Sequence, residues 1–129
     1  MEVIVALDTN RYTDLSHGDE AVANALQDAD ALVMTFVTIA ELRGGFAHGT
    51  RGKANERLLR QFLRRDDVKS LYPDDGTTVH YAQLYRELRS AGTPVPTNDI
   101  WIAALVLQHN LLLYTRDDHF RHLPQVPLL

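Results

Sequence analysis

The sequence of 129 residues contains no cysteine. This absence excludes a disulfide framework, a thiolate zinc site and a cysteine nucleophile. The N-terminal apolar run, residues 3–7, is short and follows Glu2. A membrane-spanning helix needs about 20 apolar residues, and a signal peptide needs a basic start and a longer apolar core. We therefore expect no membrane association and a cytoplasmic location.

Positive charge is also in short supply. The 13 Lys and Arg residues are outnumbered by 17 Asp and Glu residues, which gives a formal net charge of −4. This balance argues against a protein that binds nucleic acid by bulk positive charge. It does not exclude a nuclease, because a site that gathers carboxylates around divalent cations is acidic before the metal binds.

Several common catalytic motifs are missing as well. There is no HExxH, no Gly-x-Ser-x-Gly, no P-loop and no Gly-x-Gly-x-x-Gly. His119 and His122 could share a metal on a helical turn, but a surface role is the more common one for such a pair. Trp101, Tyr81 and Tyr85 have helical spacing among apolar neighbours, which indicates core or dimer packing rather than base stacking.

The residues that are present predict one α/β domain over residues 1–129. Hydrophobic residues make up 45% and charged residues 23% of a chain without repeats or linkers, as in ordinary globular domains. The apolar patterns predict strands at 3–7, 31–34, 68–72 and 111–115, with a turn at 8–10. They predict helices at 19–27, 53–65, 78–90 and 99–109, and another that begins at Thr35 or Thr38 and frays at Gly44-Gly45. Asn110 is expected to end the last of these helices in the left-handed backbone conformation. This alternation indicates a mainly parallel sheet.

Acidic residues fall where such a fold would bring them together. Asp8 directly follows the first strand, and Asp117 lies two residues after Thr115 at the end of the last strand. The carboxyl ends of parallel strands share one edge of the sheet, where ligands bind. Asp99 and Glu41 lie near the starts of two helices, which approach the same edge. Divalent cations would relieve the repulsion among these carboxylates.

Each acid also has a structural explanation. Asp8 can serve as a turn residue, and Asp99 is favoured by the helix dipole. Glu41 completes a capping-box pattern that begins at Thr38. Asp117 and Asp118 can be ordinary loop acids. The positions of these acids are therefore compatible both with a metal site and with purely structural roles.

Four segments together resemble the PIN domain: IVALDTN (4–10), TIAELRGG (38–45), PTNDIWIAA (96–104) and LLLYTRDDHF (111–120). The likeness is greatest to the toxin ribonucleases of bacterial and archaeal VapBC toxin–antitoxin modules. The resemblance implies an α/β/α sandwich and hydrolysis of RNA phosphodiester bonds by a water activated by Mg²⁺ or Mn²⁺, leaving a 5′-phosphate. It also implies a homodimer and a cognate antitoxin protein that blocks the site.

The resemblance assigns roles to particular residues. The four catalytic acids fall on Asp8, Glu41, Asp99 and Asp117, of which Asp8, Asp99 and Asp117 would bind the metal. Asn10 and Thr115 match supporting polar positions, and Asp118 could assist or replace Asp117. The pair Arg11-Tyr12 is bulkier and more polar than the short apolar pair of the family pattern. This departure affects the expected rim of the pocket and leaves the acids unchanged.

Basic residues concentrate beyond Glu41. They could contact RNA phosphates or antitoxin carboxylates, or they could form a solvated helix face. These residues are Arg43, Arg51, Lys53, Arg57, Arg60, Arg64 and Arg65.

Three other functions would explain parts of the same pattern. A small Mg²⁺ phosphatase would need a second Asp where Asn10 stands, and a suitably placed lysine. A housekeeping RNA-processing PIN nuclease would use the same acids, and the compact chain favours the toxin over it. A non-catalytic PIN-like interaction module is disfavoured because all four acids are present.

Overall fold

Four short apolar segments form one parallel sheet in the computed structural model, which describes residues 1–129. They are β1 (Ile4–Leu7), β2 (Ala31–Thr35), β3 (Val68–Leu71) and β4 (Leu112–Tyr114). The strand order is β3-β2-β1-β4, and all three pairings are parallel. The parallel sheet expected from the apolar patterns is therefore confirmed.

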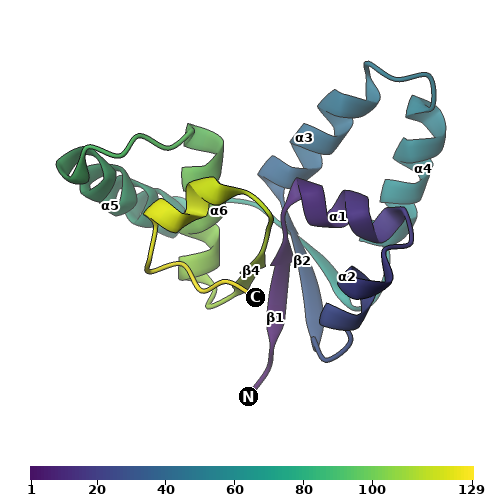
Figure 1. Cartoon of the computed structure of the whole chain (residues 1–129), viewed down its shortest axis with the longest axis horizontal. Helices are drawn as coiled ribbons and strands as arrows, with labels where there is room; N and C mark the ends of the chain where they lie inside the picture. Colours follow the sequence, from purple (N-terminus) through teal and green to yellow (C-terminus); the bar gives the residue numbers. More distant parts are fainter.

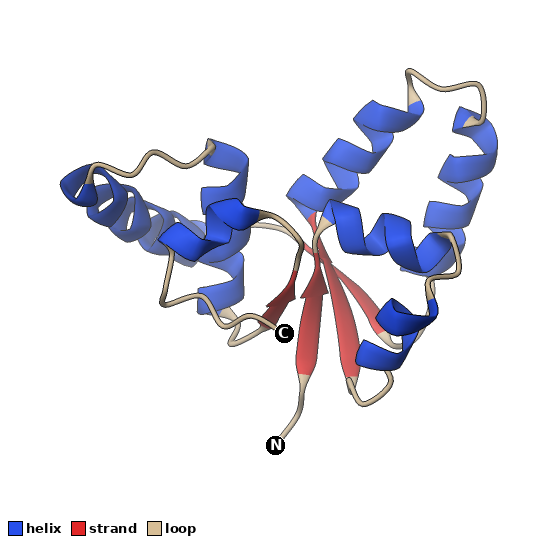
Figure 2. Ribbon diagram, viewed as in Figure 1, coloured by secondary structure: helices blue, strands red, loops and turns tan.

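Helices cover both faces of this sheet, as Figures 1 and 2 show. One side carries α1 (Thr9–Ser16), α2 (Glu20–Ala25), α3 (Phe36–Phe46) and α4 (Gly52–Leu63). The other carries α5 (Asp75–Ala91), α6 (Thr97–Gln108) and the 3₁₀ helix η1 (Asp118–His122). Side chains alternate along β1, so that Val5 and Leu7 join one buried cluster and Ala6 joins the other. The three-layer α/β/α sandwich is thus confirmed.

The register of β1 and β4 determines how the residues after these two strands lie at the carboxyl edge of the sheet. Leu7 pairs with Tyr114, and the backbone N–H of Asp8 donates to the carbonyl of Tyr114 at 3.0 Å. The residues after both strands therefore emerge side by side. On the far side of β4, the C-terminal tail bonds to Leu113 through Pro127 and Leu129, at 2.9 Å each. This tail covers the free edge of β4.

Helix α1 was not predicted, because residues 8–10 have the composition of a turn. The Asp8 side chain instead accepts a hydrogen bond from the backbone N–H of Thr9 and caps the helix. Tyr12 is buried and packs edge-on against Phe62 of α4, with ring centroids 5.2 Å apart. Tertiary packing therefore stabilises a helix whose sequence is mostly polar.

The start of α3 removes the structural explanation of Glu41. Thr35 is the N-cap, and its hydroxyl accepts a hydrogen bond from the backbone N–H of Thr38 at 3.3 Å. Glu41 therefore lies too far into the helix to form a capping box, and that interpretation was wrong. The helix ends at Phe46, one residue beyond the glycine pair where the sequence predicts fraying, and neither Gly44 nor Gly45 has a positive φ.

Two other helix ends follow local capping rules. Helix α5 begins three residues before the predicted position 78, because Asp74 and Thr77 form a capping box. Asn110 has a φ of 54°, which confirms the left-handed residue after α6. None of the helices has both the length and the apolar character needed to cross a membrane.

The turn between α3 and α4 depends on close packing at Gly52. A Cβ atom there would lie 2.6 Å from the carbonyl oxygen of Phe46, which is too close. We predict that Gly52→Ala lowers the free energy of unfolding by about 1–3 kcal/mol, as overpacking typically does. Gly49→Ala is the matched control, since its nearest atom would be 3.9 Å away. Equal unfolding curves in urea for the two variants would refute this packing argument.

Candidate metal centre

Asp8 is held rigidly at the carboxyl edge of the sheet. It is 5% exposed, and its Oδ1 accepts a hydrogen bond from the backbone N–H of Thr9 at 2.8 Å. Its Oδ2 accepts from the hydroxyl of Thr115 at 2.7 Å. That hydroxyl also accepts from the backbone N–H of Asp117 at 3.0 Å. One threonine side chain therefore joins the two acids that follow neighbouring strands.

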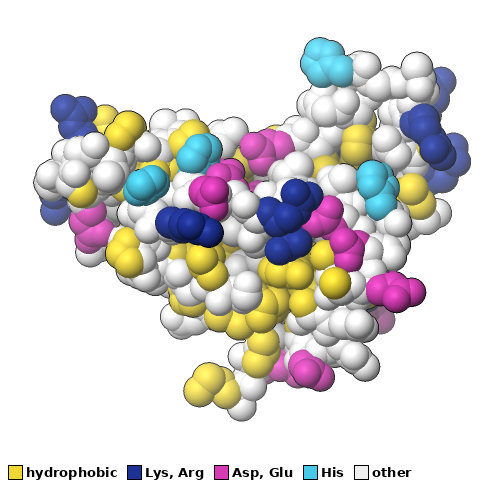
Figure 3. Space-filling model, in the orientation of Figure 1, with side chains coloured by type: hydrophobic (Ala, Val, Ile, Leu, Met, Phe, Trp, Pro, Cys, Tyr) yellow, Lys and Arg dark blue, Asp and Glu magenta, His cyan; other side chains and the backbone are white.

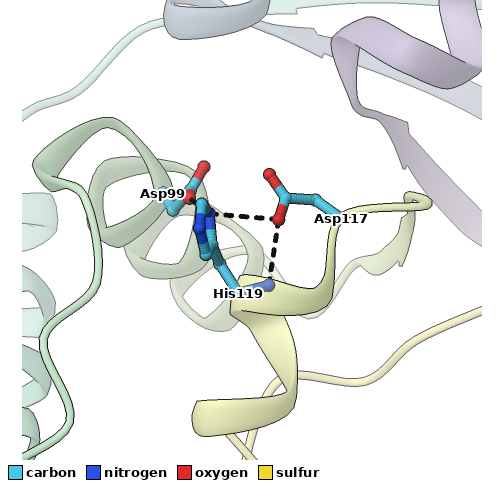
Figure 4. A group of neighbouring side chains, drawn as sticks. All are labelled: Asp99, Asp117 and His119. Atoms are coloured by element: carbon cyan, nitrogen blue, oxygen red, sulfur yellow. Dashed lines mark hydrogen bonds and ion pairs between the residues drawn. The ribbon is translucent and has the colours of Figure 1, made fainter.

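Asp99, Asp117 and His119 form a compact group of potential metal ligands (Figure 4). One potential ligand atom from each lies within 4.8 Å of the others. Nδ1 of His119 lies 2.8 Å from Oδ2 of Asp99 and 3.0 Å from Oδ1 of Asp117. The same Oδ1 of Asp117 accepts a hydrogen bond from the backbone N–H of His119 at 2.9 Å, which caps η1. Three elements, α6, the loop after β4 and η1, thus meet at this point.

The electrostatics of the group concentrate negative charge at this edge of the sheet. Burial raises the pKa of Asp99 above its usual value, and the nearby carboxylates of Asp117 and Asp8 act in the same direction. The hydrogen bond from His119 opposes these effects. Asp99 in turn raises the pKa of His119, with a further contribution from Asp117. Negative charge at this edge is therefore only partly balanced by the chain itself.

Glu41 lies at the other end of the same edge. Its Oε1 accepts a hydrogen bond from the hydroxyl of Thr9 at 2.8 Å, directly after Asp8. It is exposed and does not belong to the group of Asp99, Asp117 and His119. The structure thus connects Glu41 to Asp8 through Thr9.

Asn10 supports the site by holding its loop. The side-chain oxygen of Asn10 accepts a hydrogen bond from the backbone N–H of Arg116 at 3.2 Å. The Arg116 side chain pairs with Asp14 of α1 through two contacts, at 2.9 and 3.0 Å. Arg116 also keeps the pKa of Asp14 below its usual range. The loop that carries Thr115 and Asp117 is therefore fastened to α1.

Asp117 and Asp118 have clearly different positions. Asp117 contacts His119 inside the cluster, whereas Asp118 is exposed and pairs only with Arg121, at 3.3 Å. The geometry therefore favours Asp117 as the acid of the site.

His119 is the residue whose place at the site was missed by sequence reasoning. It was paired with His122 and expected at the surface, but its ring contacts two of the predicted metal ligands. Its position two residues after Asp117, inside the segment LLLYTRDDHF, was the available signal. Trp101 packs against Tyr81 with centroids 4.2 Å apart and is partly buried, which agrees with a packing role.

Most of the predicted basic residues lie along or beside α4, whereas Arg43 lies on α3, and Lys and Arg side chains gather on this side of the molecule in Figure 3. Four of them, Lys53, Arg57, Arg60 and Arg64, line a groove of about 660 Å³ between α4 and the end of α3. Glu56 in this groove binds Arg43 and Arg60 at 3.0 Å each. The other three cations of the groove make no ion pair, so it is locally positive.

Comparison with known proteins agrees with this architecture. A family model described as the PIN domain matches residues 5–126. Ribonuclease VapC1 of Haemophilus influenzae (strain R2866) is 32% identical over 115 residues, which are 89% of this chain and 81% of that protein.

Solved structures extend the likeness to three dimensions. VapBC-1 from nontypeable Haemophilus influenzae matches with a TM-score of 0.86 and 28% identity over 98% of this chain and 97% of the other. VapBC-5 from Mycobacterium tuberculosis, described as a member of the VapBC family of toxin–antitoxin systems, matches with a TM-score of 0.74 and 30% identity. That match covers 97% of this chain and 94% of the other. The chain therefore belongs to the PIN domain family and is similar throughout its fold to the VapC ribonucleases.

Proposed function

We propose that this protein is a metal-dependent endoribonuclease that acts as the toxin of a toxin–antitoxin pair. The observation that carries the proposal is the cluster of Asp99, Asp117 and His119 at one edge of the sheet, with Asp99 buried and Asp8 joined to Asp117 through Thr115. The ribonuclease name of the relative from Haemophilus influenzae supports the same activity.

Asp8, Asp99 and Asp117 would hold the divalent cation, which we propose to be Mg²⁺ or Mn²⁺. Their carboxylate oxygens are ligands that both ions accept. The raised pKa of Asp99 indicates a site short of positive charge, which fits such an ion. When bound, the cation would activate water and neutralise charge on the phosphate oxygens.

The residues of the chain have separate tasks in the proposed reaction. Asp8 is oriented by Thr9 and Thr115, which fixes one side of the site. Glu41 uses one oxygen to accept from Thr9, and its Oε2 makes no hydrogen bond and can accept a proton from the attacking water. The water oxygen attacks phosphorus and passes a proton to Glu41, the P–O3′ bond breaks, and the leaving 3′ oxygen takes a proton from solvent. The products then carry a 5′-phosphate and a 3′-hydroxyl.

The proposed partners follow from the family. The description of VapBC-5 as part of a toxin–antitoxin system supports a cognate antitoxin protein for this chain. We include in the proposal a homodimer and a cytoplasmic location, where RNA is available.

The two alternatives differ in how well they fit. A housekeeping PIN nuclease would use the same acids, but the relative described as part of a toxin–antitoxin system favours the toxin. A non-catalytic PIN-like module would have no need for Asp8 and Asp99, two buried acids at an edge where charge is costly.

Asp8→Asn tests the assignment of the acids. The variant keeps the size of the side chain but removes the charge, so RNA cleavage should fall by on the order of 10²- to 10³-fold. Asp118→Asn is the matched control and should cleave at nearly the wild-type rate, because Asp118 is exposed outside the cluster. Cleavage of a labelled RNA at saturating Mn²⁺ measures both. Wild-type activity of Asp8→Asn would disprove the mechanism.

Metal-dependent stabilisation should depend on pH in a defined direction. Free metal at about 100 times Kd should stabilise the fold by about 2.7 kcal/mol at neutral pH. The pKa of Asp99 is raised, so a proton occupies its carboxyl at a higher pH than usual and competes with the metal. The gain in Tm with Mn²⁺ should therefore be full above this pKa and decline progressively as the pH falls below it. Asp99→Asn should show no such gain at any pH in a thermal scan; a wild-type gain in that variant would exclude Asp99 as a ligand.

We further propose that the basic groove on α4 contacts RNA phosphates, since polar and charged side chains dominate its lining. Arg57 and Arg64 make no ion pair, so both can bind phosphate without breaking one. The double variant Arg57→Ala/Arg64→Ala should weaken RNA binding and reduce the slope of log K against log salt by about 1.4, or about 0.7 per contact. Arg86→Ala/Arg89→Ala on α5 is the charge-matched control. An unchanged slope in the α4 variant, or an equal loss in the control, would rule out this surface.

A further inference from the structure

His119 approaches the acidic centre in a fixed orientation. Asp117 caps η1 by accepting from the backbone N–H of His119 at 2.9 Å. The next residue, Phe120, is 1% exposed and anchors η1 in the core. With Asp117 and Phe120 fixing the chain on either side of His119, its imidazole lies against Asp99 and Asp117 (Figure 4).

The distances from Nδ1 are those of atoms that share one metal ion. Ligands at about 2.0–2.1 Å in an octahedral shell are separated by about 3 Å along each edge. Nδ1 lies 2.8 Å from Oδ2 of Asp99 and 3.0 Å from Oδ1 of Asp117. The imidazole nitrogen therefore lies as close to each carboxylate as neighbouring ligands of a small divalent ion would.

Both carboxylates converge on the same ring nitrogen of His119. Nδ1 can carry a single N–H, yet Oδ2 of Asp99 and Oδ1 of Asp117 both lie within ion-pair distance of it. The other ring nitrogen, Nε2, makes no hydrogen bond within the chain, and the side chain is 48% exposed. Water can therefore bond to Nε2, as the outer nitrogen of a metal-bound histidine requires.

We propose that His119 is a direct ligand of the metal ion, together with Asp99 and Asp117. This inference rests on the proposed function, which supplies the ion. The centre then offers nitrogen as well as oxygen. Mg²⁺ prefers oxygen ligands and water, whereas Mn²⁺ and later transition ions accept imidazole more readily. The structure thus assigns to His119 a preference of this centre for Mn²⁺ over Mg²⁺.

The test is a spectroscopic measurement on the intact chain loaded with Mn²⁺. Pulsed electron paramagnetic resonance detects the ¹⁴N coupling of a nitrogen bound to Mn²⁺ and needs no variant. We expect this coupling in the wild type and its loss in His119→Ala. In calorimetry, His119→Ala should bind Mn²⁺ about 10- to 100-fold more weakly, the scale of a lost metal-site interaction, and lose much less affinity for Mg²⁺. His122→Ala, in the same short helix, is the control and should keep both the coupling and the affinities.

The outcomes separate this inference from the proposed function. Wild-type protein that binds Mn²⁺ without ¹⁴N coupling would show that His119 stays outside the coordination shell, and the nuclease proposal would stand. Equal losses of Mn²⁺ and Mg²⁺ affinity in His119→Ala would overturn the proposed preference. If the wild type binds neither ion and cleaves RNA in the presence of a chelator, the metal-dependent function itself fails, and the ligand role of His119 fails with it.

Discussion

The parallel pairing of β1 with β4 determines where the chemistry can occur. Asp8 and Thr115 are 107 positions apart in the chain, yet the register of Leu7 with Tyr114 brings them within a hydrogen bond. That register is specified by burial, because Ala6 and Leu113 are fully enclosed between the layers. A slip of one residue would turn the buried side of β4 toward the opposite layer. The positions of the acids therefore depend on the packing of the core.

Collecting carboxylates at one edge costs stability, and the chain offsets this cost without placing arginine among them. Thr9 and Thr115 donate to Asp8, and His119 contacts the other two acids. The nearby arginines are occupied elsewhere. Arg11 and Arg116 both bind Asp14, at 3.3 and 2.9 Å, on the α1 side of the loop. Because Asp14 holds these two guanidinium groups, the negative potential at the edge remains available to a divalent ion.

How far the sequence predicts the site differs among its members. The places of Asp8 and Asp117 follow from a general rule, since Asp8 directly follows β1 and Asp117 lies three residues after β4, both at the carboxyl ends of buried parallel strands. Helix α1 could not be foreseen, because only Tyr12 of its residues is buried and its partner Phe62 lies on α4. The structural alternative for Glu41 could not be rejected either. Thr35 and Thr38 are both good caps, and the choice between them depends on how far β2 extends along β3.

The neighbours Asp118 and His119 show how local geometry decides which side chain joins Asp99 and Asp117. In a 3₁₀ helix successive side chains point about 120° apart, so only one of two adjacent residues can face a given site. The sequence does not reveal whether the segment after Asp117 forms such a turn or how it is rotated. Phe120 resolves both questions, because its buried ring fixes the rotation of η1 about its axis. With Phe120 directed into the core, His119 faces Asp99, and Asp118 is left to pair with Arg121 in solvent. A core contact thus selects which polar side chain joins the acidic centre.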